Sequence, residues 1–245
     1  GGLLSGIIVY TWAPEARGAG TDAVLHAFHH EEGHIRGRVP PLKLTASVLT
    51  LATGGSGGVQ GPMSQIGAGV GSWLAEKMGF SARERRILML AGCAGGLSAI
   101  FRAPLGAALI SIEILYREDF ETEAIIPCII SSVVSYVMFT SIFGARGIFS
   151  TPDFHLHHLQ ELILYGLLGV VCAAFGFVFV RCLYGMRNRI FNPLPIPPHI
   201  KPALGGIGVG IIGLFCPQAL GVGFGWIQMA IWGKLAFWSM LFIAL

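Results

Sequence analysis

Charged side chains are scarce in this sequence of 245 residues. Asp, Glu, Lys and Arg make up 12% of it, against about 25% in an ordinary soluble domain. A chain that is 53% hydrophobic, with a mean hydropathy of +0.69, has too few polar groups to cover a water-exposed surface. This argues against a cytosolic enzyme and against a nucleic-acid-binding protein. We expect an integral, multi-pass protein of the lipid bilayer, in the plasma (inner) membrane.

Cysteine is also sparse, and its positions carry no pattern. The five cysteines include no CxxC pair, which argues against a metal site or a disulfide framework. The segment His29-His30-Glu31-Glu32, with His34 nearby, lacks the HExxH spacing of a zinc site, so we interpret it as a solvated loop rather than a metal centre. Another group, His155, His157 and His158, is either a pH sensor or an ordinary exposed loop. We expect neither a metal nor a cofactor.

Glycine, by contrast, is in excess. There are 35 glycines and 13 prolines, whereas glycine makes up only about 7% of average proteins. Both residues are commoner in membrane helices than in soluble ones. A density this high predicts helices that stop and restart inside the membrane.

The clearest interruption lies in the segment 44–75, which has no charged residue but is broken by glycines and a proline at 54–62. A simple spanning helix needs about 20 apolar residues. We therefore predict two shorter helices with a glycine-rich break between them. Irregular backbone at membrane depth is tolerated only where it is buried in protein or lines a cavity.

Other apolar runs predict the remaining helices. They are a hairpin of short helices at 87–100 and 103–116, spans at 124–143 and 159–184, a helix at 202–216, and a last run from near Leu235. The basic loops 81–86 and 185–201 should be cytoplasmic. The hairpin then returns 117–123 to the side of 81–86, and 144–158 lies outside.

The chain resembles itself at an offset of 203 residues. Residues 2–20 align with residues 205–223, and in both copies an apolar run ends in Pro-x-Ala-x-Gly-x-Gly. This is either chance similarity in glycine-rich apolar sequence or a duplicated membrane unit, as in inverted-repeat transporters. On the second interpretation, 1–155 is the first repeat and 156–245 begins the second. The counterpart of the break at Gln60 would then lie beyond Leu245, which predicts that the chain is a piece of a longer protein.

The glycine break has a chemical interpretation. A helix N-terminus exposes unpaired N–H groups and the positive end of the helix dipole, so a glycine-rich turn that leads into a helix can bind an anion with its backbone. Pro62 suits the first helical turn, where its missing N–H costs nothing. The alternative is a break that only lets helices pack closely. A P-loop is excluded because no Lys-Ser/Thr pair follows.

Several motifs resemble those of the CLC family of chloride channels and chloride/proton exchangers. Residues 58–62 (GVQGP) resemble the family's G-[KR]-E-G-P, and 64–67 (SQIG) follow as its V-Q-I-G does. Residues 101–106 (FRAPLG) are similar to F-N-A-P-L-A, 112–115 (IEIL) to its E-E or E-V pair, and 18–22 (GAGTD) to G-S-G-I-P. The resemblance covers essentially the whole chain. The family's third anion loop and pore tyrosine are absent and would lie beyond the end of this sequence.

The resemblance implies an all-α polytopic membrane protein of tilted and broken helices, with the inverted-repeat CLC-type architecture. It also implies a homodimer with one pore per subunit, in which 103–116 and 124–143 form the dimer surface. The transported ion would be chloride or a similar small anion. The anion-binding positions that it assigns are Gly18, Ala19, Gly20, Thr21, Gly58, Val59, Gln60 and Gly61.

Departures from the family pattern bear on mechanism. The family's gating glutamate is Gln60 here, and its inner proton-relay glutamate is Ile114. Neither side chain can carry a proton. Pro62 and Glu113 match structural positions, and Ala19 replaces a serine hydroxyl. We therefore predict a CLC-type chloride channel, giving passive anion transport without proton coupling.

Other interpretations remain open. One is a chloride/proton antiporter with different proton carriers, and another is a weakly conducting regulatory homologue. A membrane-embedded enzyme subunit is disfavoured because the predicted spans contain no histidine. Arg102 is interpreted as part of a solvated turn rather than as a pore charge. Trp226, Trp232 and Trp238 are interpreted as anchors at the membrane surface.

Overall fold

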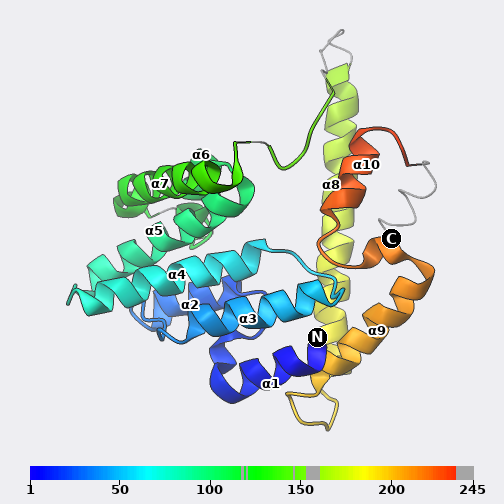
Figure 1. The fold of residues 1–245 in the computed structure, drawn as a ribbon, viewed down its shortest axis with the longest axis horizontal. Helices are drawn as coiled ribbons and strands as arrows, with labels where there is room; N and C mark the ends of the chain where they lie inside the picture. Colours follow the sequence, from blue (N-terminus) through cyan, green and yellow to red (C-terminus); the bar gives the residue numbers. More distant parts are fainter. Residues whose placement is uncertain (117–118, 120, 146, 153–160, 236–245) are drawn as a thin grey trace.

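The computed structural model describes residues 1–116, 119, 121–145, 147–152 and 161–235, and every regular element within these ranges is helical (Figure 1). The predicted all-α class is therefore confirmed. The α-helices are α1 (Gly2–Trp12), α2 (Thr21–His30), α3 (Val39–Ala52), α4 (Gln60–Lys77), α5 (Ala82–Phe101), α6 (Pro104–Glu113), α7 (Ile125–Phe143), α8 (Glu161–Met186), α9 (Lys201–Phe215) and α10 (Phe224–Ile231). Short turns of helix occur at Pro14–Ala16, Thr122–Ala124, Arg187–Phe191 and Pro217–Ala219. The predictions for His155, His157, His158, Trp238 and the apolar run after Leu235 fall outside the described residues.

The predicted interruption is present. Helix α3 ends at Ala52 and α4 begins at Gln60, with irregular backbone between them. The predicted hairpin is present as well, because α5 ends at Phe101 and α6 begins at Pro104. Arg102 between them adopts a left-handed conformation (φ 54°) and lies over the ring of Phe139, in agreement with a turn.

Helix α5 begins earlier than the apolar pattern predicts. It starts at Ala82, so the basic cluster 83–86 lies in its first turns and not in a loop. The reason is a capping box, in which the Ser81 side chain accepts the N–H of Glu84 and the Glu84 carboxylate accepts the N–H of Ser81. Both bonds satisfy amides at the helix start that would otherwise be unpaired. At 20 residues, α5 is also longer than the short helix predicted there.

Helices α4 and α5 pack at backbone distance. A Cβ atom on Gly67 would lie 2.2 Å from the carbonyl oxygen of Gly92, and one on Gly71 would lie 2.1 Å from that of Leu88. Small residues permit such contacts between membrane helices. Helices α6 and α7 complete this bundle, whose buried side chains include Met89, Leu90 and Leu97. Part of the glycine excess therefore serves helix packing rather than any site.

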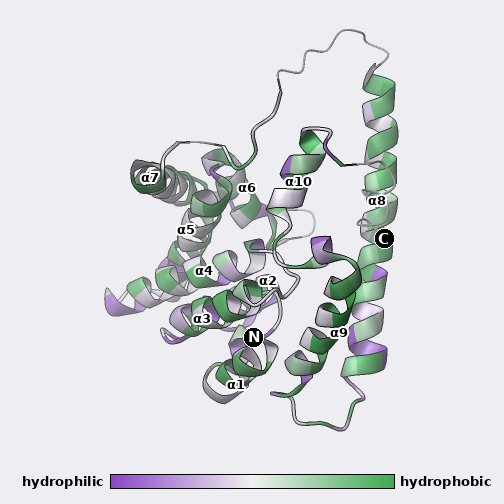
Figure 2. Cartoon of the chain, turned by 45° about the vertical axis from the view of Figure 1, so that its right-hand side comes forward, coloured by the Kyte–Doolittle hydropathy of each residue, from purple (hydrophilic) through white to green (hydrophobic). Residues whose placement is uncertain are grey.

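Two helical segments are long and apolar enough to cross a membrane, Thr122–Phe143 and Leu162–Phe191, among the residues that the structure describes. Helix α8 stands apart from the bundle and is hydrophobic along most of its length (Figure 2). Its side chains are exposed, with Ile163 at 74% and Phe179 at 67%. An apolar helix whose described side chains are largely exposed matches the low polarity of a bilayer interior.

The two copies of the sequence repeat, 2–20 and 205–223, follow the same order of helix, short helical turn and helix. Helix α1 leads through Pro14–Ala16 into α2, and α9 leads through Pro217–Ala219 into α10. The residues that end the first helices have closely similar angles, φ −147° and ψ 74° at Ala13 against φ −134° and ψ 80° at Cys216. Helices α1 and α9 also pack together, since a Cβ on Gly2 would lie 2.4 Å from the carbonyl oxygen of Pro202. The boundary at 155/156 stays a prediction.

Candidate functional site

The N-termini of α2 and α4 meet. A Cβ atom on Gly61 would lie 2.4 Å from the carbonyl oxygen of Ala19, and one on Gly20 would lie 2.5 Å from that of Gly61. Gly20 has φ +118°, which favours glycine. The loop before α2 and the first turn of α4 therefore touch backbone to backbone, and the structure brings together two segments that are 40 residues apart in the sequence.

The amides at these two helix starts are unpaired within the part of the chain that the structure describes. In α2, the first N–H group that donates to a backbone carbonyl is that of Val24, which bonds the carbonyl oxygen of Gly20. In α4, the first is that of Met63, which bonds the carbonyl oxygen of Val59. The N–H groups of residues 18–21 and 58–61 have no acceptor there. Two helix dipoles add their positive ends at the same point. This arrangement of backbone donors is suited to an anion.

The starts of α2 and α4 face a large cavity of about 1110 Å³, which α1, α3 and α9 enclose in part. Gly18, Ala19, Gly58, Gln60 and Gly61 line it. The other three predicted positions, Gly20, Thr21 and Val59, do not line it. Gln60 is the first residue of α4 and is exposed. Its side chain makes no hydrogen bond to any described residue, so an uncharged, unpartnered amide stands at the start of α4.

Lys43 bonds carbonyl groups of the loop that precedes α2, a role that the sequence patterns do not indicate. Its side chain is buried, at 3% exposure, and Nζ donates to the carbonyl oxygens of Ala16 and Gly18, each at 2.8 Å. The signal that was available is a lone lysine that directly precedes the charge-free run 44–75. An ionisable residue inside a membrane segment is by default a functional candidate.

We expect Lys43→Met to reduce anion flux by at least about tenfold, because hydrogen bonds to a charged group contribute about 1.5–3 kcal/mol each and the local positive charge is lost as well. The measurement is chloride efflux from liposomes that contain the full-length protein. Lys77→Met, at the exposed end of α4, is the matched control and should keep wild-type flux. Equal flux from both variants would contradict a role for Lys43.

The glycine break also contacts the second copy of the repeated motif. The N–H of Gly57 donates to the carbonyl oxygen of Gly221, and the N–H of Gly221 donates to that of Gly54, both at 3.3 Å. Leu220 lies against Gly54 and Gly213. The second loop thus uses its backbone to hold the break in place, a contact that sequence patterns do not indicate.

Two of the other predicted positions, Glu113 and Ile114, lie at the end of α6. Ile114 follows the last residue of α6 and packs against the hydrophobic core, while Glu113 is exposed. Pro62 lies in the first turn of α4, as expected. Trp232 donates from Nε1 to the carbonyl oxygen of Ser150, which ties the loop after α7 to the end of α10.

The histidine-rich segment differs from its interpretation as a loop. His29 and His30 form the last turn of α2, and only the residues that follow are in a turn. His29 Nε2 lies 2.9 Å from the carbonyl oxygen of Leu115, so this side chain joins α2 to the end of α6. Among the described residues no group of three potential metal ligands is found.

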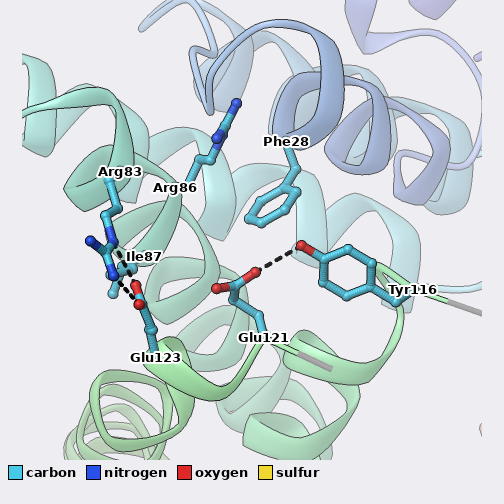
Figure 3. A pocket seen from close by; sticks show the side chains of 7 residues that line it. All are labelled: Phe28, Arg83, Arg86, Ile87, Tyr116, Glu121 and Glu123. Carbon is cyan, nitrogen blue, oxygen red and sulfur yellow. Dashed lines mark hydrogen bonds and ion pairs between the residues drawn. The ribbon is translucent and has the colours of Figure 1, made fainter. Parts of the chain in front are cut away.

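A smaller pocket of about 350 Å³ lies where the start of α5 meets the segment after α6 (Figure 3). Arg83 forms an ion pair with Glu123 and Tyr116 donates to Glu121 at 2.9 Å. The Arg83–Glu123 pair places the end of the predicted 117–123 segment beside the predicted 81–86 segment.

The chain is similar to known proteins along its whole length. A family model described as voltage gated chloride channel matches residues 1–245. The chain is 34% identical over 211 residues to the uncharacterized protein MJ0305 of Methanocaldococcus jannaschii, covering 85% of this chain and 52% of that protein. It is 31% identical over 243 residues to the H(+)/Cl(-) exchange transporter ClcA of Cronobacter sakazakii, covering 96% and 52%. The chain thus spans about half the length of these relatives.

Solved structures show the same fold. A slow cyanobacterial Cl⁻/H⁺ antiporter superposes with a TM-score of 0.85 at 26% identity, over 98% of this chain and 57% of that one. A CLC-type fluoride/proton antiporter superposes with a TM-score of 0.84 at 20% identity, over 99% and 62%, a likeness in fold. With the family model matched along its whole length, and with its broken helices and paired helix starts, this chain belongs to the voltage-gated chloride channel (CLC) family, whose members transport anions across membranes and are not enzymes.

Proposed function

We propose that this chain is part of a passive anion channel, selective for chloride or a similar small anion, that moves no protons. The observation that carries the proposal is the uncharged Gln60 at the start of α4, beside unpaired backbone amides. A site of N–H groups binds an anion without holding it as a full positive charge would, and rapid conduction needs that balance.

The proposed anion-binding positions are the two helix starts, Gly18 to Thr21 and Gly58 to Gly61. Gln60 occupies the gate position without a titratable group, and Ile114 occupies the inner proton position. Ile114 packs against the hydrophobic core, where an ionised side chain would be costly. Gln60 at the start of α4 and Ile114 after the end of α6 both lack a titratable group. Either substitution alone would interrupt a proton path, so both support transport without protons.

We further propose a homodimer in the plasma (inner) membrane, formed through α6 and α7. Leu105, Leu109, Ile126 and Ile130 on these helices are each more than half exposed, which supports an apolar contact surface at this place. We also propose that 1–155 and 156–245 correspond to a first repeat and the start of a second, on the basis of the shared backbone course of α1–α2 and α9–α10.

The test is proton movement driven by a chloride gradient. Liposomes that contain the full-length protein should show chloride flux with no accompanying proton uptake, measured with a pH electrode in weakly buffered medium. A related exchanger serves as the positive control. Stoichiometric proton movement would contradict the channel proposal and favour an antiporter with other proton carriers, as the names of several relatives suggest. Absence of chloride flux would favour a regulatory homologue.

A further inference from the structure

Gln65 is a buried amide just beyond the first turn of α4, and its side chain has one paired and one unpaired end. The residue is 1% exposed. Its Nε2 donates to the carbonyl oxygen of Glu15 at 2.8 Å. Its Oε1 is buried and has no hydrogen-bond partner among the described residues. An unpaired buried oxygen is unfavourable, so an apolar side chain would suit this position better unless the Nε2 donor had a specific role.

The donor reaches the turn that leads into the first glycine loop. The carbonyl oxygens of Glu15, Ala16 and Gly18 all accept hydrogen bonds from side chains, the first from Gln65 and the other two from Lys43. The carboxylate of Glu15 forms a two-fold ion pair with Arg36, in the segment between α2 and α3. The turn is therefore held at separate points from α4, from α3 and from the α2–α3 connection.

This pattern is what a backbone anion site requires. A carbonyl oxygen that faced the anion would repel it, and a loop rich in glycine can turn either its carbonyls or its amides toward the path. Side-chain donors occupy the carbonyls of Glu15, Ala16 and Gly18, while the amides of residues 18–21 have no acceptor among the described residues. The backbone contact between Gly61 and Ala19 fixes the distance to the second helix start.

We infer that Gln65 is a positioning residue for the anion. It does not touch the ion, but it holds the 15–18 turn against α4 so that the amides of both helix starts converge. This inference rests on the proposed function, because it assumes that an anion binds at these amides. It assigns Gln65 a role in anion affinity, beyond that of filling space in the bundle.

The test compares Gln65→Met with Ser72→Ala in the full-length protein. Methionine matches the size of glutamine but cannot donate, and it also removes the unpaired oxygen. Ser72 is equally buried on α4, two turns further along, where its Oγ donates to Gly33 and accepts from Ile35. Arg36→Gln, at a more exposed position, loosens the same turn without changing the core. Chloride affinity is measured by calorimetry in detergent, and stability by the thermal midpoint Tm.

Gln65→Met should raise the Kd for chloride by about fivefold, which corresponds to the loss of one hydrogen bond of about 1 kcal/mol, without lowering Tm. Arg36→Gln should raise the Kd in the same direction. Ser72→Ala should lower Tm and leave the Kd unchanged. The inference is overturned if Gln65→Met keeps the wild-type Kd, if Ser72→Ala raises it equally, or if the wild-type protein binds no chloride. Proton-coupled flux in the wild type would instead contradict the channel proposal and leave this comparison of affinities intact.

Discussion

Gly61→Ala should strongly reduce anion transport. The added Cβ atom would lie 2.4 Å from the carbonyl oxygen of Ala19, 2.9 Å from its carbonyl carbon and 3.3 Å from its side chain. Contacts below 3 Å to backbone force one of the two segments to move, since no flexible side chain can give way. The separation of the starts of α2 and α4 would increase, and the amides would no longer converge on one point.

The expected loss of chloride flux from liposomes is at least about tenfold, because overpacking of a tightly packed contact costs about 1–3 kcal/mol and the displaced backbone is itself the binding group. Gly20→Ala should have an equal or larger effect, since that residue also has φ +118° and lies 2.5 Å from the carbonyl oxygen of Gly61. Two separate constraints therefore apply at that position.

Gly176→Ala is the matched control. Gly176 lies in α8, does not line the large cavity, and a Cβ there has no neighbour within 4 Å. Its flux should stay close to that of the wild type. Size-exclusion profiles of all three variants separate loss of transport from loss of folding. If Gly61→Ala and Gly176→Ala transported equally well, contact between the two helix starts would not be needed for conduction.

Gln60→Glu should convert an ungated site into a pH-dependent one. A carboxylate at the first position of α4 would accept hydrogen bonds from the same amides that we propose for the anion, and the helix dipole would favour its charged form. Near neutral pH we expect chloride flux to fall by about tenfold, since interactions of this kind reach about 2 kcal/mol when partly buried. The wild type, with an amide at this position, should show no such inhibition.

The sign of the pH dependence follows from the helix start. Backbone N–H groups stabilise the carboxylate over the acid, so the pKa of an introduced glutamate should lie below its ordinary value of about 4.3. Inhibition should persist at neutral pH and be relieved only as the pH falls through that lowered pKa. The measurement is chloride flux across an acid series, compared with the wild type at each pH.

Gln218→Glu is the control for this substitution. Gln218 lies in the Pro217–Ala219 turn of the second copy of the repeated motif and is not among the residues that line the large cavity. Its replacement adds the same charge without placing it at the start of α4. Wild-type flux from Gln60→Glu at every pH would show that the start of α4 is not on the anion path.

Much of the fold was predictable because its signals are local. The glycines and proline at 54–62 predicted the break between α3 and α4, and the turn at Arg102 and Pro104 predicted the hairpin of α5 and α6. The start of α5 was missed because an apolar pattern cannot detect a helix turn made of charged residues. There the Ser81–Glu84 capping box decided the boundary.

The candidate site was predictable in part. Its glycines could be identified because each helix start carries a motif of its own. The hydrogen bonds made by Lys43 and Gln65 could not be predicted, since their partners lie 25 to 50 residues away in the sequence. The pairing of Gly221 with Gly54 and Gly57 was equally hidden, because it joins two glycine loops whose sequences indicate only that each is flexible.

The sequence by itself determined that this is a helical membrane protein with breaks in its helices and no titratable group at residue 60. Composition, apolar run length and the identity of one side chain settle those points, and none of them depends on distant contacts. Only the tertiary structure decided that the starts of α2 and α4 meet, and that Lys43 and Gln65 bond the carbonyls of Glu15, Ala16 and Gly18 while the amides of both helix starts have no acceptor among the described residues. The physical reason is that what a site made of backbone can bind depends on where its N–H groups point, and side chains from other helices fix that direction.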